Sequence, residues 1–232
     1  MDIGKAFTFV FDDKDWIVKI LIAAAILLVG SLFSWVLAIP LLLAFAILGG
    51  YQVEITRRVI QGDPNTLPEW DNWADLIVDG IKVLVIGIVY ALPAIIISLC
   101  LGVPAGLLGE DAPGLSSLFG ILSSCLSFIW AIVMSIVLPA AIAFFVADGE
   151  LAAAFRFGDV LAFVRDNLST YLITFIMSWV AYIIGGLGSI VCGVGAFVTT
   201  PYAYMVVGHL YGQAYLDGLS QAPEPILEEE II

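Results

Sequence analysis

Four long stretches that contain no charged residue place the strongest limit on how this chain can fold. An α-helix crosses the hydrocarbon layer of a membrane with about 20 apolar residues, and each stretch is at least that long. Of the 232 residues in the chain, 62% are hydrophobic and only 12% are charged, against about 25% charged in soluble domains. The sequence therefore predicts an all-α integral membrane protein. The stretches are residues 20–53, 83–109, 112–147 and 167–208.

The first and last stretches are each long enough for two helices, so each must turn back once. Ser34 and Trp35, followed by Pro40, mark a break in the first stretch, and the glycine-rich segment 185–189 marks one in the last. The third stretch contains no comparable turn signal. We expect it to form one long helix from about Ser116 onward.

This interpretation gives six transmembrane helices, arranged as three hairpins within a single membrane domain, residues 1–222. An acidic tail follows at residues 223–232, and its composition predicts disorder. The six predicted spans are approximately residues 17–34, 36–60, 82–108, 116–147, 168–186 and 189–215.

The positions of the basic residues test this count independently. With six spans, all eight lysines and arginines fall on one side of the membrane, and the opposite connections contain none. The positive-inside rule therefore predicts a multi-pass protein of the cell membrane with both termini in the cytoplasm. Each odd-numbered span is preceded on that side by an aromatic, charged segment, which we expect to form a short interfacial helix. These segments are residues 7–16, 70–82 and 155–166.

Charge and cysteine content argue against several classes of function. The net charge is −13, so binding to nucleic acid is not expected. Cys100, Cys125 and Cys192 lie singly in apolar stretches, without the paired spacing of metal or redox motifs. No grouping of nucleophile, base and acid is recognisable. We therefore expect no catalytic site, no metal site and no cofactor.

Polar residues are concentrated in one connection, residues 67–80, between two of the apolar stretches. One interpretation is an interfacial helix that begins near Asn72, with its tryptophans among the lipid headgroups and its acids toward water. The alternative is an acidic, aromatic patch that binds a cation, a lipid headgroup or a protein partner. Arg57, Arg58 and Lys82 lie near enough in sequence to neutralise the acids internally. The candidate residues are Glu69, Trp70, Asp71, Trp73, Asp75 and Asp79.

Three further polar residues lie inside predicted spans. His209 is the only histidine, and an ionisable residue within a span is a functional candidate by default. A neutral imidazole that bonds a neighbouring tyrosine or a backbone carbonyl is the structural alternative. Ser123 and Ser127 belong to a stripe of small residues that either lets two helices approach closely or lines a polar pathway.

The order and spacing of several residues resemble a known family. Gly50-Tyr51, Arg57-Arg58, Gly62 and the segment 67–71 resemble the multi-pass membrane family of bacteria and archaea named domain of unknown function 4013. The segment 155–158 is similar to a second recurrent segment of that family. The resemblance covers nearly the whole chain except the acidic tail. It implies a six-helix membrane domain, without a known activity or catalytic residues.

Two functional hypotheses follow from these observations. The first is a non-enzymatic helper that binds lipid or a membrane-protein partner at its cytoplasmic face, alone or as a homo-oligomer. The second is a small-solute permease that uses the serine stripe and His209. Polar groups that converge within discontinuous helices would favour the permease, whereas a solidly packed apolar interior would favour the helper.

Overall fold

The computed structural model describes residues 1–109, 111–190 and 193–221. All regular structure in these ranges is helical, and they contain no strand. The predicted acidic tail, residues 223–232, lies outside the described residues. The α-helices are α1 (Ile3–Thr8), α2 (Trp16–Leu32), α3 (Ser34–Leu37), α4 (Ile39–Ile60), α5 (Trp73–Ile97), α6 (Val103–Leu108), α7 (Pro113–Asp148), α8 (Phe157–Asp166), α9 (Leu168–Leu187) and α10 (Ala196–Gln221).

The predicted breaks within the long apolar stretches are confirmed. The chain turns back around α3, where Ala38 adopts the left-handed conformation (φ 59°), and Pro40 then lies in the first turn of α4. The last stretch is interrupted after α9 by the short 3₁₀ turn η4 (Gly188–Ile190). The third stretch forms the single long helix α7, with Pro139 inside it.

Four helical segments are long and apolar enough to cross a membrane. A fifth becomes possible if α2 is counted together with the helical segment Ile3–Asp12 before it, although the two are bent by 94°. Among the described residues α10 does not reach the same hydropathy, so the predicted count of six spans is not confirmed. The four segments are Ile39–Ile60, Trp73–Leu108, Pro113–Asp148 and Leu168–Ile190.

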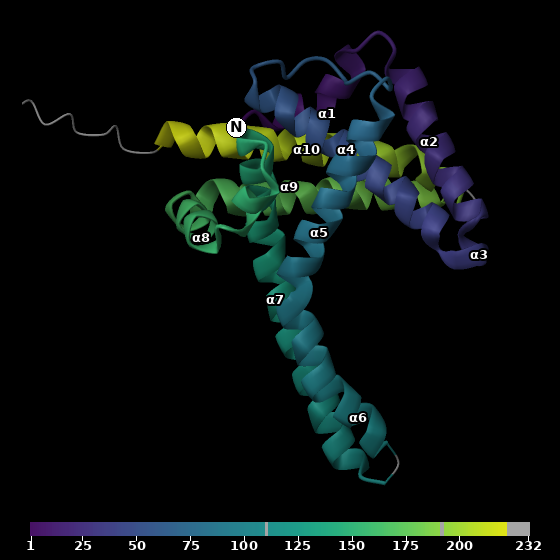
Figure 1. Cartoon of the computed structure of the whole chain (residues 1–232), viewed down its shortest axis with the longest axis vertical. Helices are drawn as coiled ribbons and strands as arrows, with labels where there is room; N and C mark the ends of the chain where they lie inside the picture. Colours follow the sequence, from purple (N-terminus) through teal and green to yellow (C-terminus); the bar gives the residue numbers. More distant parts are fainter. Residues whose placement is uncertain (110, 191–192, 222–232) are drawn as a thin grey trace, which may run out of the picture.

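The helices of each successive pair, α2 with α4, α5 with α7, and α9 with α10, are in contact with each other. Figure 1 shows α5, α6 and α7 as one long antiparallel hairpin that projects from the rest of the molecule, while α9 and α10 lie side by side across it. α10 is the central helix, because it packs against α2, α4, α7 and α9 and buries residues on most of its surface. The predicted hairpin arrangement is not confirmed.

Two of the predicted interfacial segments are integrated into the protein. In the first, Phe9 and Val10 are almost completely buried in the protein core, so lipid is not needed to cover them. The second does not form a separate helix, since α5 runs without interruption from Trp73 into the membrane-length segment. A location of these segments at the membrane surface stays a prediction.

A close crossing of α4 and α5 positions the connection between them. Gly50 and Gly80 lie at this crossing, where a Cβ atom on Gly50 would be 1.8 Å from the carbonyl oxygen of Leu76. A Cβ atom on Gly80 would be 1.7 Å from the carbonyl oxygen of Ala46. Only glycine permits this approach of two backbones. The crossing therefore fixes the start of α5 against the last turns of α4.

Candidate binding pocket

Aromatic stacking holds the connection between α4 and α5 against the body of the protein. The ring of Trp70 stacks on that of Tyr51 in α4, with centroids 4.2 Å apart and planes at 10°. The indole N–H of Trp70 donates a hydrogen bond to the carbonyl oxygen of Lys19 (3.2 Å), and the Tyr51 hydroxyl donates one to the carbonyl oxygen of Pro68 (2.8 Å). These contacts hold residues 68–70 in a defined place.

The buried ammonium group of Lys19 forms a second attachment, which we call the Lys19 clamp. Its Nζ lies 2.9 Å from a carboxylate oxygen of Asp13, 2.6 Å from one of Glu69 and 3.0 Å from the carbonyl oxygen of Leu67. The same Asp13 oxygen accepts the backbone N–H of Leu67 at 3.2 Å. Burial alone would raise the pKa of Asp13, but the hydrogen bonds from Lys19 and from backbone N–H groups outweigh it and hold the pKa below its usual range.

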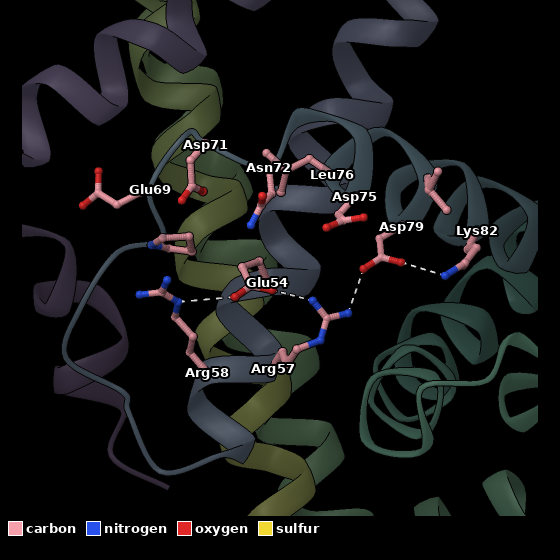
Figure 2. Close-up of a pocket in the computed structure, with 12 residues that line it drawn as sticks. Glu54, Arg57, Arg58, Glu69, Asp71, Asn72, Asp75, Leu76, Asp79 and Lys82 are labelled. Atoms are coloured by element: carbon pink, nitrogen blue, oxygen red, sulfur yellow. Dashed lines mark hydrogen bonds and ion pairs between the residues drawn. The ribbon is translucent and has the colours of Figure 1, made fainter.

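A cavity of about 360 Å³ opens between the last turns of α4, the connection and the first turns of α5 (Figure 2). Its volume is within the range of about 300–1,000 Å³ that is typical of ligand pockets. Five acidic and three basic residues contribute to its walls, which leaves two net negative charges. The lining residues are Glu54, Arg57, Arg58, Pro68, Glu69, Asp71, Asn72, Asp75, Leu76, Val78, Asp79 and Lys82.

A chain of ion pairs runs along one wall of this pocket, as Figure 2 shows. Asp79 lies 2.7 Å from Arg57 and 2.8 Å from Lys82. Arg57 also pairs with Glu54, which in turn lies 3.4 Å from Arg58. Because these charges come from both α4 and α5, the chain reinforces the helix crossing and leaves little free charge on this wall.

The other charged residues of the pocket are more open. Asp71 and Asp75 are exposed, and neither forms an ion pair with any of the described residues. Glu69 is also exposed, although it pairs with Lys19. Arg58 makes only long contacts, so its guanidinium group retains donors that a ligand could use. The pocket thus offers carboxylates on the connection and α5, and a guanidinium group on α4.

The predicted site residues divide into those that line the pocket and those that do not. Glu69, Asp71, Asp75 and Asp79 line it, whereas Trp70 and Trp73 are not among its lining residues. The rings of these two tryptophans stack with centroids 5.5 Å apart, and 41% of the surface of Trp73 is exposed. Asp71 and Asp75 are exposed, and their orientation toward water stays a prediction. The same prediction is wrong for Asp79, whose side chain is only 13% exposed because two basic residues enclose it.

The residues around these acids agree only in part with the contacts expected from the sequence. Arg57 and Lys82 do neutralise an acid internally, as their position in the sequence suggested. Asn72 lies at the first position before α5, but its side chain makes no capping hydrogen bond. Lys19, Tyr51 and the Gly50–Gly80 crossing are important to the pocket and were not identified from the sequence. A close spacing of small residues, Ala46-x-x-x-Gly50, was the available signal for the crossing.

The intramembrane candidates lie outside this pocket. His209 is completely buried in α10, and its Nε2 lies 3.0 Å from the carbonyl oxygen of Pro64. Its Nδ1 lies 3.0 Å from the side-chain amide nitrogen of Gln213, which makes it an acceptor and leaves Nε2 as the protonated nitrogen of a neutral ring. Ser123 lies on the part of α7 that faces Gly102, where an added Cβ atom would make an ordinary contact with the serine hydroxyl. Ser127 is on the same helix, and its hydroxyl is buried.

The arrangement of the pocket is suited to binding a charged group. Among the described residues, no cluster of three or more histidine, cysteine, aspartate or glutamate side chains could hold a metal ion. The lining residues include neither a cysteine nor a serine nor a histidine that could act as nucleophile or base. Charged walls at the edge of an apolar protein recognise a ligand through electrostatic attraction and hydrogen bonds.

Comparison with known proteins gives one match. The model of a family described as "Protein of unknown function (DUF4013)" matches residues 32–194, which include α4, α5 and the whole pocket between them. No curated protein and no solved structure matches the chain.

Proposed function

We propose that this chain, which belongs to the DUF4013 family of proteins of unknown function, is a membrane protein that acts by binding rather than by catalysis. Its binding site is the pocket between α4 and α5, and its ligand carries a positively charged group at the cytoplasmic surface of the membrane. In this role it is a helper protein that holds a lipid or a membrane-protein partner.

The observation that carries this proposal is the uneven pairing of charges in the pocket. Asp79 and Glu54 are neutralised by the ion-pair chain, and Glu69 shares the ammonium group of Lys19 with Asp13. Asp71 and Asp75 retain uncompensated negative charge at the mouth of the cavity. A cationic group placed between them would offset one of the two net negative charges of the site.

The position of the pocket favours a ligand that is presented by the membrane. α4 ends at Ile60 and α5 begins at Trp73, and both belong to segments of membrane-spanning length and hydropathy. The pocket lies where these two segments leave the apolar layer on the same side. Since Arg57, Arg58 and Lys82 also lie there, the positive-inside rule places this side in the cytoplasm.

Contacts far apart in the sequence support six crossings with both termini on that side. Asp13 and Lys19, at the start of α2, contact Leu67 in the connection after α4. Asp2 is hydrogen bonded to Gln213 near the end of α10. These contacts join one end of each helix pair, whereas the connections from α2 to α4 and from α9 to α10 lie at the other end. We therefore propose that each pair crosses the membrane and returns.

This topology predicts which positions react with a membrane-impermeant thiol reagent. In a background without the native cysteines, Gln61→Cys and Glu150→Cys are expected to react only after the cells are opened. Asp111→Cys, at the tip of the α5–α7 hairpin, is expected to react on intact cells. Labelling of Glu150→Cys on intact cells would contradict the proposed topology.

The binding proposal predicts that the open acids are needed to hold a cationic probe. Asp71→Asn combined with Asp75→Asn is expected to weaken binding of a fluorescent alkyltrimethylammonium probe to the protein in neutral detergent by about fivefold, since two partly exposed ion pairs contribute about 1 kcal/mol in sum. The fold should be retained because both side chains are exposed.

The matched control removes the same charge elsewhere. Asp111→Asn combined with Glu150→Gln also deletes two exposed acids, neither of which lines the pocket, and should leave binding within about twofold of the wild type. Equal binding by both double variants would show that the probe responds only to total charge, and the proposed site would be wrong.

The permease alternative has less support from the geometry. Both ring nitrogens of His209 are occupied by Pro64 and Gln213, and the ring lies 4.4 Å from that of Phe9. Ser123 lies in a helix-packing contact. These groups do not converge on one cavity among the described residues.

A further inference from the structure

The two arginines of the pocket differ in how closely their guanidinium groups contact neighbouring residues. Arg57 makes two close ion pairs, to Glu54 and Asp79. Arg58, in the same turn of α4, lies 3.4 Å from Glu54, 3.4 Å from the Thr66 hydroxyl and 3.5 Å from a backbone carbonyl oxygen. A guanidinium group has five N–H donors. The three contacts of Arg58 are long and involve only Nε and one terminal nitrogen, so the other terminal nitrogen has no partner among the described residues.

The opposite wall carries the complementary charge. Figure 2 shows Arg58 on the α4 side of the pocket and Asp71, with Glu69, on the connection that faces it. Asp75 continues the acidic wall in the first turn of α5. A ligand that bridges the cavity would therefore meet a positive group at one end and negative groups at the other.

From this arrangement, and on the basis of the function proposed above, we infer that the ligand is the zwitterionic headgroup of a membrane phospholipid. The phosphate binds the guanidinium group of Arg58, because the planar fork of arginine matches two phosphate oxygens. The ammonium group, two carbons further on, binds between Asp71 and Asp75. A purely anionic headgroup would pair only with Arg58, and a purely cationic headgroup would pair only with the acidic wall.

The surroundings of the pocket favour a lipid over a soluble zwitterion. Val78 lines the cavity yet is 49% exposed, and Ile81 in the next turn of α5 is also 49% exposed. These apolar side chains lead from the charged pocket toward the membrane-spanning part of α5. They provide a surface along which the glycerol and acyl chains of the bound lipid can lie.

Native mass spectrometry of the full chain in neutral detergent can test this inference with three diacyl lipids of equal chain length. Phosphatidylethanolamine should bind at least about fivefold more tightly than phosphatidylglycerol or a diacyl trimethylammonium lipid, because only it engages both walls. Arg58→Gln should remove most of this preference for phosphatidylethanolamine over the cationic lipid. Arg165→Gln, which removes an exposed charge on α8, should leave it unchanged.

The outcomes separate this inference from the proposed function. If the cationic lipid binds best and Arg58→Gln leaves its binding unchanged or stronger, the zwitterionic assignment is overturned while a cation-binding pocket remains. If no lipid depends on Asp71 and Asp75, both are overturned. If water-soluble glycerophosphoethanolamine binds as tightly as the lipid, the inference that the ligand comes from the membrane is overturned.

If Arg58→Gln fails to fold, Arg58→Lys serves as the second variant, because lysine keeps the positive charge but lacks the planar guanidinium group. Arg58→Lys should show a weaker preference for phosphatidylethanolamine than the wild type. An unchanged preference would overturn the role of Arg58.

Discussion

Replacing Lys19 with methionine is expected to destabilise the protein by about 3–5 kcal/mol, the usual cost of removing one partner from a buried ion pair. The side chain of Lys19 is only 4% exposed, and that of Asp13 is 9% exposed, so the carboxylate would lose its counter-ion in a place that water scarcely reaches. The Leu67 carbonyl oxygen would also lose the closer of its two donors and keep only Arg58, at 3.5 Å. The measurement is thermal or denaturant unfolding of the full chain in detergent.

A neighbouring lysine supplies the control for this prediction. Lys14 is exposed and forms no ion pair with the described residues, so Lys14→Met removes the same charge without disturbing a buried contact. We expect its free energy of unfolding to stay within about 0.5 kcal/mol of the wild type. Similar stability of the two variants would mean that the Lys19 clamp does not hold the connection in place.

The Lys19 clamp should also be visible in the pH dependence of stability. The pKa of Asp13 is lower in the folded protein than its unfolded value of about 3.9, so its contribution is complete above that value. The contribution is lost as the pH falls through the folded pKa. The wild type should therefore lose stability more steeply below about pH 4 than Lys19→Met does, because the variant has already lost the pair.

The sequence was sufficient to predict the helical class and most of the helix breaks, because these depend on local composition. A run of apolar residues must be helical in a membrane, and proline or clustered glycine shows where it is interrupted. Pro40 and the glycine-rich segment 185–189 are the residues that mark these breaks. The long helix α7 was predicted by the same reasoning, since its stretch contains no such interruption.

The site was only partly predictable, because its construction depends on contacts between distant segments. The acids of the connection stood out by composition, and Asp71 and Asp75 are exposed as expected. Lys19 contacts a carbonyl group 48 residues away, and no local pattern indicates such a partner. The same reason explains why Asp79 was expected in water, although Arg57 from α4 encloses it together with Lys82.

The helix crossing below the pocket leads to the second large effect. Gly80→Ala is expected to destabilise the protein by about 3 kcal/mol, because the new methyl group would lie 1.7 Å from a backbone oxygen of Ala46 and a backbone cannot turn aside as a side chain can. α5 must then move away from α4. This movement separates Asp79 from Arg57 and widens the pocket, so binding of the cationic probe should also fall.

Gly87 provides the matched control, because it lies in the same helix and a Cβ atom there would have no neighbour within 4 Å in the part of the chain that the structure describes. Gly87→Ala removes the flexibility of a glycine within a helix and should leave the protein equally stable or up to about 1 kcal/mol more stable. The two substitutions therefore add the same atom to the same helix with opposite expected signs. If Gly80→Ala were as stable as Gly87→Ala and still bound the probe, α4 and α5 would not cross at these glycines. In that case the ion-pair chain between α4 and α5 would not form a wall of the binding pocket.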